Sequence, residues 1–211
     1  MTRASTIVSV PRSCLEAITL VEVKGALRAD IMRTYEYLQG GRLRRIVNCL
    51  RSPGVQAVIA FRFGQWLDSQ SSLLKLLLQP IYFILHGLVQ ILWGIDLSRF
   101  ATIGPGLYIG HFGGITIAPG VVIGRNCNVS QHNTIGVSGQ GEKAGVPTIG
   151  DNVYIAPGAQ LFGKISIGNN VKIGANAVIY KDIPDNAIVV LDPGFKIVSY
   201  KGNRSLEENK T

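Results

Sequence analysis

Cysteine is rare in this 211-residue chain, which contains only Cys14, Cys49 and Cys127. An odd number of widely spaced cysteines argues against a disulfide framework and favours free thiols in a reducing compartment. The first residues also lack the apolar core of a secretory signal peptide, because the run from Thr6 to Val10 is too short and charge follows it closely. We therefore expect a cytoplasmic protein.

Acidic residues are in the minority, and glycine is sparse in the first part of the chain. Lys and Arg outnumber Asp and Glu by 21 to 13, which gives a net charge of +8. Most of this excess lies in the first hundred residues, so any basic face is N-terminal. No recognised nucleic-acid module surrounds these arginines and no aromatic residues are interleaved with them, which argues against a nucleic-acid partner. The composition changes sharply near Asp96 and separates residues 1–95 from the rest.

The second part of the chain is rich in a six-residue repeat. An aliphatic residue, usually followed by a small one, recurs at Ile103, Ile109, Ile117, Ile123, Val129 and Ile135, and again at Ile149, Ile155, Leu161, Ile167, Ile173 and Ile179. This pattern predicts a parallel β-helix built from hexapeptides, because one inward side chain per repeat would fill a narrow, stacked core. An ordinary sheet protein would instead show two-residue alternation and hairpin turns.

The N-terminal region has helical patterns. Apolar residues recur at intervals of three and four over residues 31–39, 43–51 and 54–69, and Gly and Pro separate these segments at Gly40-Gly41 and Pro53. We therefore expect three helices whose exposed edges carry arginines.

A long apolar run then covers residues 72–95 and is long enough to suggest a membrane span. Five residues interrupt it and disfavour a span: Lys75, Gln79, Pro80, His86 and Gln90. We expect a pair of helices buried against the solenoid end or a neighbouring subunit. A helix on the inner face of the membrane, assisted by the upstream arginines, is the alternative.

Histidine is as scarce as cysteine, with only His86, His111 and His132. His111 interrupts the repeat within GLYIGHFGG, where the next aliphatic pair arrives two residues late. An imidazole in a Gly-rich bulge is accessible to a substrate and can take and return a proton near neutral pH. A surface histidine in a loose turn is the alternative.

Three stretches resemble the hexapeptide-repeat acyltransferases, most closely the serine acetyltransferase branch with its capsule and exopolysaccharide O-acetyltransferase relatives. They are GIDLSRFATIGPGLYIGHFGGITIAPGVVIG, TIGDNVYIAPGAQLFGKISIGNNVKIGANAVIYKDIP and KIVSYKG. The resemblance implies a mainly β protein with a left-handed parallel β-helix over residues 96–198, an α-helical region over 1–95 and a tail over 199–211. It also implies a homotrimer with active sites between subunits.

The resemblance further implies that His111 is the catalytic base and that Asp96 is its partner. In the family this histidine removes the proton from an acceptor hydroxyl that attacks acetyl-CoA, and returns it to the thiolate. Fifteen residues separate the two, three fewer than the family's eighteen-residue coil, which puts Asp96 on the adjacent coil. A turn or N-cap role is its alternative. We expect Gly110, Gln131 and His132 to line the acceptor site, with a structural or exposed histidine as the alternative for His132.

The family binds acetyl-CoA in a groove between two solenoids. The matching positions in this chain are Gly136, Ala156, Pro157 and Ala175, with Lys181 and Lys196 as candidates for the CoA phosphates. The segment 137–148, VSGQGEKAGVPT, resembles the family's loop that extends toward a neighbouring subunit's active site. A surface loop without function is the alternative.

Two departures from the family pattern decide the predicted acceptor. The serine enzymes carry an aspartate before the catalytic histidine and an Arg-His-Pro element after the loop, where this chain has Gly110 and Gly145-Val146-Pro147. Without those groups serine loses its ionic partners, so the sequence favours a hydroxyl of a bacterial surface polysaccharide or its oligosaccharide precursor, a carbohydrate acceptor. Serine O-acetyltransferase is the second interpretation, and a non-catalytic solenoid scaffold is the third.

A metal is not expected. The γ-class carbonic anhydrases share the solenoid but need three zinc histidines, two of them closely spaced, and the three histidines of this chain do not supply that arrangement.

Overall fold

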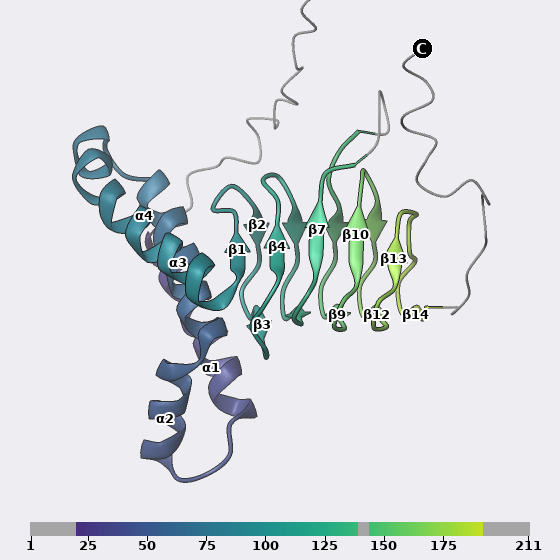
Figure 1. The fold of residues 1–211 in the computed structure, drawn as a ribbon, viewed down its shortest axis with the longest axis horizontal. Coiled ribbons are helices and arrows are strands. Elements are labelled where there is room, and N and C mark those ends of the chain that lie inside the picture. Colours follow the sequence, from purple (N-terminus) through teal and green to yellow (C-terminus); the bar gives the residue numbers. More distant parts are fainter. Residues whose placement is uncertain (1–19, 139–143, 192–211) are drawn as a thin grey trace, which may run out of the picture.

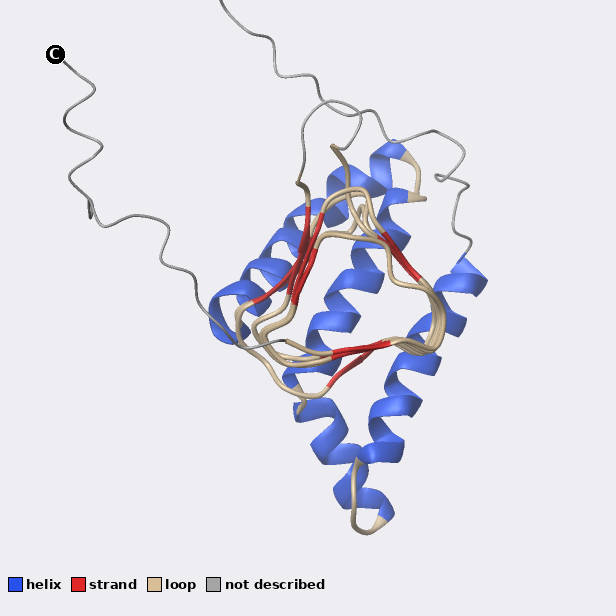
Figure 2. Ribbon diagram, turned by 90° about the vertical axis from the view of Figure 1, so that its right-hand side faces the viewer, coloured by secondary structure: helices blue, strands red, loops and turns tan. Residues whose placement is uncertain are grey.

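The computed structural model describes residues 20–138 and 144–191, and within them a helical region precedes a β-solenoid (Figure 1). The helices are α1 (Leu20–Tyr37), α2 (Arg42–Arg51), α3 (Pro53–Asp68) and α4 (Ser72–Trp93). They form a layer across the N-terminal end of the solenoid (Figures 1 and 2). The predicted parallel β-helix with N-terminal helices is thus confirmed.

Three parallel sheets form the faces of the solenoid, which is triangular in cross-section (Figure 2). Sheet A contains β1 (Ile95–Leu97), β4 (Ile115–Ile117), β7 (Thr134–Gly136), β10 (Gln160–Phe162) and β13 (Val178–Ile179). Sheet B contains β2 (Thr102–Ile103), β5 (Val122–Ile123), β8 (Thr148–Ile149) and β11 (Ser166–Ile167). Sheet C contains β3 (Tyr108–Ile109), β6 (Asn128–Val129), β9 (Tyr154–Ile155), β12 (Lys172–Ile173) and β14 (Ile188–Val189).

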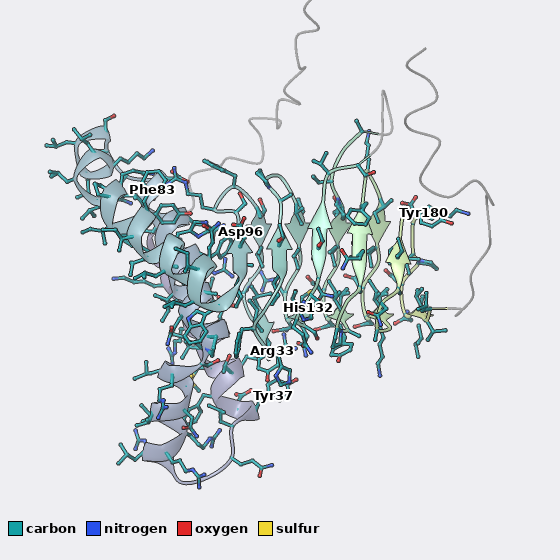
Figure 3. All side chains as sticks on the ribbon, in the orientation of Figure 1. Arg33, Tyr37, Phe83, Asp96, His132 and Tyr180 are labelled. Carbon is teal, nitrogen blue, oxygen red and sulfur yellow. The ribbon has the colours of Figure 1, made fainter. Side chains whose placement is uncertain are left out.

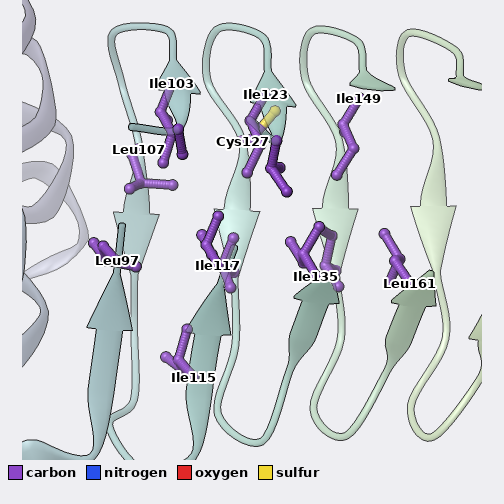
Figure 4. Close-up of a cluster of buried hydrophobic side chains, with 14 of the residues drawn as sticks. Leu97, Ile103, Leu107, Ile115, Ile117, Ile123, Cys127, Ile135, Ile149 and Leu161 are labelled. Carbon is purple, nitrogen blue, oxygen red and sulfur yellow. The ribbon is translucent and has the colours of Figure 1, made fainter. Parts of the chain in front are cut away.

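The strand register follows the hexapeptide repeat. Ile117 pairs with Ile135, eighteen residues later, which is three hexapeptides and one full coil. Ile109 pairs with Val129, twenty residues later, because the bulge at His111 adds two residues to that coil. The aliphatic side chains of successive coils point inward and stack in a single column of core residues (Figure 4). The repeat therefore places at least one buried side chain at every described strand except β14, as the sequence predicts for the repeat.

Asparagines form a ladder along one corner of the solenoid. Asn152, Asn170 and Asn186 all have positive φ, a conformation that asparagine tolerates better than most residues. The Nδ2 of Asn152 donates to the Oδ1 of Asn170 at 3.2 Å, and Asn170 donates to Asn186 at the same distance. These side chains join successive coils at the position where the backbone turns.

A buried ion pair between α1 and α3 makes hydrogen bonds to the first coil of the solenoid. The Nε of Arg62 lies 2.9 Å from the Oδ2 of Asp30, and both side chains are almost fully buried. The Oδ1 of Asp30 accepts hydrogen bonds from the backbone N–H groups of Gly106 and Leu107, each at 2.7 Å. Arg62 also donates to the carbonyl oxygen of Ile103 at 2.7 Å. Burial raises the pKa of Asp30, while Arg62 and the two N–H groups oppose that rise.

The helical region differs from its sequence prediction at its first helix. α1 begins at Leu20, eleven residues before the predicted start at residue 31. Val21, Val23 and Gly25 have weak helix propensity, which hides the first turns in the sequence, but α1 packs along α3 and is stabilised by that contact.

The apolar run differs more strongly, because it forms one helix and not the expected pair. Its burial against a neighbouring subunit stays a prediction. The run forms one continuous helix, α4, which contains Pro80 and ends at Gly94 in the left-handed conformation. The α4 helix is long and apolar enough to cross a membrane, but only 11% of its most apolar 18-residue stretch is buried inside the protein. Pro80 is exposed.

Candidate active site

One corner of the solenoid carries most of the predicted site residues. At this C–A corner, where sheet C leads into sheet A, residues 110–114, 130–133, 156–159 and 174–177 lie on successive coils. The backbone N–H of His132 donates to Gly113 at 2.8 Å and the N–H of Gly158 donates to Gln131 at 3.0 Å. The chain thus brings His111, Gln131, His132, Ala156, Pro157 and Ala175 to a single edge.

His111 lies in the widened first turn of this corner. The turn holds Gly113 and Gly114 at positive φ, and a Cβ at Gly114 would lie 2.7 Å from the Nδ1 of His132. Glycine is therefore required where the two histidine-bearing turns stack. Phe112 packs edge-on against Trp93, with ring centroids 5.3 Å apart. His111 itself is exposed, and its ring has no hydrogen-bond partner within the described ranges.

Asp96 is the middle residue of β1, the edge strand of sheet A, and contacts a different imidazole. It pairs in register with Thr116 of β4, so it occupies the first rung of the sheet next to the C–A corner. Its Oδ1 lies 3.4 Å from the Nε2 of His86 in α4, and its side chain is 47% exposed (Figure 3). In the described parts of the chain, no hydrogen bond or ion pair joins Asp96 to His111. The sequence reasoning missed His86, whose only signal was an imidazole inside an apolar helix.

His132 and Gln131 lie on the coil after His111. His132 is exposed and has a φ of 58°, and its carbonyl oxygen accepts a hydrogen bond from Gln160 at 2.8 Å (Figure 3). The Oε1 of Gln131 is buried and lacks a hydrogen-bond partner among the residues described. Both predicted acceptor residues therefore lie beside the turn that holds His111, and Gln131 has an unused acceptor oxygen.

Asn133 fixes this turn and was not predicted. It is fully buried, and its Nδ2 donates to the carbonyl oxygens of Ala156 and Ala159 at 2.8 and 3.1 Å. Its Oδ1 accepts from the N–H of Ser130 at 2.9 Å. A polar residue at a position where the neighbouring coils carry apolar side chains is the sequence signal that could have identified it.

The predicted acetyl-CoA residues lie at two edges of sheet A, which are the corners of the solenoid where the strands of this sheet begin and end. Ala156 is buried, Pro157 is half-buried and Ala175 is exposed, all at the C–A corner. Gly136 and Lys181 lie instead at the opposite edge, where sheet A leads into sheet B. Lys181 is exposed, next to Tyr180 (Figure 3). Lys196 lies outside the described residues.

The segment 137–148 also leaves sheet A at this opposite edge. Its base is closed by an antiparallel bridge between Ser138 and Gly145, while residues 139–143 lie outside the described residues. Within one chain the segment therefore starts on the far side of the sheet from His111.

No group of three or more His, Cys, Asp or Glu side chains in the described ranges could hold a metal ion. The absence of a metal stays a prediction.

Comparisons with known proteins agree with this architecture. A family described as bacterial transferase hexapeptide (six repeats) matches residues 147–181. The chain is 34% identical over 142 residues to serine acetyltransferase of Synechococcus elongatus, covering 67% of this chain and 56% of the relative. It is 33% identical over 141 residues to serine acetyltransferase of Helicobacter pylori, covering 65% of this chain and 77% of the relative.

Solved structures give the same result. The crystal structure of Neisseria gonorrhoeae serine acetyltransferase in complex with serine matches with a TM-score of 0.67 and 28% identity, covering 83% of this chain and 69% of that one. The chain spans a little over half the length of the Synechococcus relative.

These relatives contradict the predicted carbohydrate acceptor. The similar proteins are serine acetyltransferases, the second interpretation of the sequence, whereas Gly110 and Val146 had placed a carbohydrate acceptor first. That preference rested on two positions, while the similarity to the Synechococcus serine acetyltransferase extends over 142 residues.

Proposed function

Because this chain belongs to the hexapeptide-repeat transferase family, we propose that it is a serine O-acetyltransferase that uses acetyl-CoA as the acetyl donor. The proposal rests on one observation above the others, the placement of His111. This imidazole is exposed and free of hydrogen-bond partners within the described ranges, and it lies in the one widened turn of the C–A corner. The similarity to serine acetyltransferases supports serine as the acceptor.

The reaction requires a group that moves one proton twice. His111 accepts the proton of the serine hydroxyl as its oxygen attacks the thioester carbonyl of acetyl-CoA. When the carbon–sulfur bond breaks, the imidazolium returns that proton to the leaving thiolate. The products are O-acetylserine and CoA, and His111 ends in its starting protonation state.

Asp96, on the first strand of sheet A, supports this chemistry. A carboxylate near the base stabilises the imidazolium that forms during attack and orients its ring. Asp96 is half exposed and is held at one oxygen by His86, which leaves its second oxygen without a partner among the described residues. We propose that His86 holds Asp96 in position and that Asp96 acts on His111 when substrates are bound.

The substrates would lie along sheet A. Gln131 and His132 adjoin His111 at the C–A corner and are the proposed acceptor contacts. Gly136 leaves space beside sheet A, because a Cβ at this position would meet only side-chain carbons at 3.8 and 4.0 Å. Lys181, at the same edge, supplies a point charge for a CoA phosphate.

The assembly belongs to the same proposal. The segment 137–148 starts opposite His111, so it would reach the His111 corner of a neighbouring chain in a homotrimer rather than its own. Light scattering should then give three times the chain mass of 22.8 kDa. A mass of one chain would contradict this part of the proposal.

The activity is tested by thiol release from acetyl-CoA with L-serine, and with L-alanine as the matched acceptor that lacks only the hydroxyl. We expect steady turnover with L-serine and none above the rate without acceptor for L-alanine. Equal thiol release with both amino acids, or none with either, would overturn the proposed function.

A further inference from the structure

The inward face of α4 carries polar as well as apolar residues. Gln79 accepts a hydrogen bond from Arg99 at 3.2 Å, and His86 contacts Asp96. Trp93 donates to Gln56 of α3 at 2.9 Å. Two of the five residues that interrupt the apolar run in the sequence, Gln79 and His86, are therefore used for contacts within the protein.

The outward face of α4 is almost entirely apolar. Thirteen of its residues are exposed, and only Ser72 and Gln90 among them are polar. The others are Leu73, Leu76, Leu77, Pro80, Ile81, Phe83, Ile84, Leu85, Leu88, Ile91 and Leu92. Leu76 is 73% exposed and Ile91 is 83% exposed. A surface helix of a soluble protein directs its polar face outward, so this face is unsuited to water.

α2 adds a second apolar face, and positive charge beside it. Its apolar side chains Leu43, Ile46, Val47 and Leu50 recur at helical spacing and are exposed. Arg42, Arg44 and Arg51 of the same helix are exposed as well. α2 and α4 lie at opposite ends of the helical layer, which covers the end of the solenoid (Figures 1 and 2). The apolar faces and the arginines thus belong to the same helical layer.

We propose that this helical layer docks on a phospholipid surface that contains anionic lipids, with α4 lying in the interface plane. Helices with an apolar face and basic neighbours bind at this depth, and arginines attract anionic headgroups. At α2 the charge favours anionic lipid over a second copy, because pairing of two copies through α2 would bring two identical sets of arginines together. A membrane span does not fit, because α4 packs along α3 and uses His86 and Gln79 for contacts within the protein.

The test is flotation of the full chain with vesicles of phosphatidylcholine alone and of phosphatidylcholine with phosphatidylglycerol. We expect binding to the anionic vesicles that weakens with salt. The double variant Ile84→Glu and Leu88→Glu should weaken binding by about tenfold or more, because two apolar side chains no longer enter the interface and two carboxylates face anionic headgroups. The matched control Gln90→Glu adds charge at an exposed polar position of the same helix and should lower binding less than the double variant does.

The melting temperature of the double variant reports that it remains folded, since Ile84 and Leu88 are both exposed. The proposal is overturned if the parent chain does not float with anionic vesicles, or if the double variant floats as well as the parent. A double variant that only converts a larger oligomer into a smaller one, with no vesicle binding by the parent, would identify a second copy as the occupant.

Discussion

At the residue scale, the three histidines differ because of where the fold places them. His86 is largely buried and contacts Asp96, His132 is exposed with its backbone in a left-handed turn, and His111 is exposed without a partner within the described ranges. Only an accessible imidazole whose nitrogens are not engaged is available to exchange protons with a substrate. This criterion separates His86 from the two exposed histidines, and of those two His111 is the one that lies in the widened turn of the C–A corner.

The role of Asp96 is tested by comparing it with His86. Asp96→Asn should lower kcat by at least about tenfold, because the amide cannot stabilise a developing imidazolium. His86→Gln retains a donor for Asp96 and should keep most of the activity. The measurement is kcat for each variant in the thiol-release assay, together with its pH profile.

The opposite result would assign Asp96 to structure. If Asp96→Asn and His86→Gln cause equal, small changes in kcat and equal losses of thermal stability, the pair serves only to hold α4 against the solenoid.

Asn133 should be a major local contributor to stability. Asn133→Ala removes a fully buried amide and leaves the N–H of Ser130 without its partner. We expect a loss of about 1–3 kcal/mol in the free energy of unfolding, the usual cost of an unsatisfied buried group. Asn128→Ala is the matched control, since the Oδ1 of Asn128 is buried without a partner among the described residues. Chemical denaturation of both variants measures the difference, and equal losses would contradict this account.

At the element scale, Asp30 joins α1 both to Arg62 of α3 and to the first coil of the solenoid. Asp30→Ala leaves the buried guanidinium of Arg62 without its counter-ion and two backbone N–H groups without acceptors, so we expect a loss of about 3–5 kcal/mol. Glu36→Ala removes an exposed carboxylate from the same helix and should change the unfolding free energy by less than about 0.5 kcal/mol. Thermal unfolding of the two variants tests this, and similar melting temperatures would show that the contacts of Asp30 are not what joins the two regions.

The solenoid strands were predictable from the sequence, and the orientation of α4 was not. The repeated aliphatic residue of each hexapeptide faces the core, so the positions of Ile117 and Ile135 in the sequence predict where their strands lie. The orientation of α4 depends on which neighbours its polar residues meet, such as the contact of His86 with Asp96. That contact joins two elements and leaves no periodic signal in either of them.

The candidate site was predictable to a similar degree. The late aliphatic pair marked the turn at His111, because an interrupted repeat must bulge. The sequence did not indicate that Asn133 fixes the next turn, or that Gly136 and Lys181 lie at the opposite edge from Ala156. Those relations follow from which coil edges face each other in three dimensions.

At the scale of the whole molecule, the two halves of the chain serve different surfaces. The solenoid presents sheet A and the C–A corner for the proposed reaction. The helical layer, which lies across the N-terminal end of the solenoid, presents exposed apolar and basic residues (Figure 1). The predicted acceptor was wrong at this scale, because it relied on two positions, Gly110 and Val146, rather than on the similarity of the whole domain.

The central claim is that the corner holding His111 is where acetyl transfer takes place, and a pair of variants tests it most directly. His111→Asn removes the base at an exposed position, and His132→Asn makes the same change one coil away, where asparagine tolerates the left-handed backbone. Measured with acetyl-CoA and L-serine, kcat should fall by about 10²–10⁴-fold for His111→Asn and by less than tenfold for His132→Asn. A folded His111→Asn protein with the kcat of the parent chain would contradict the claim.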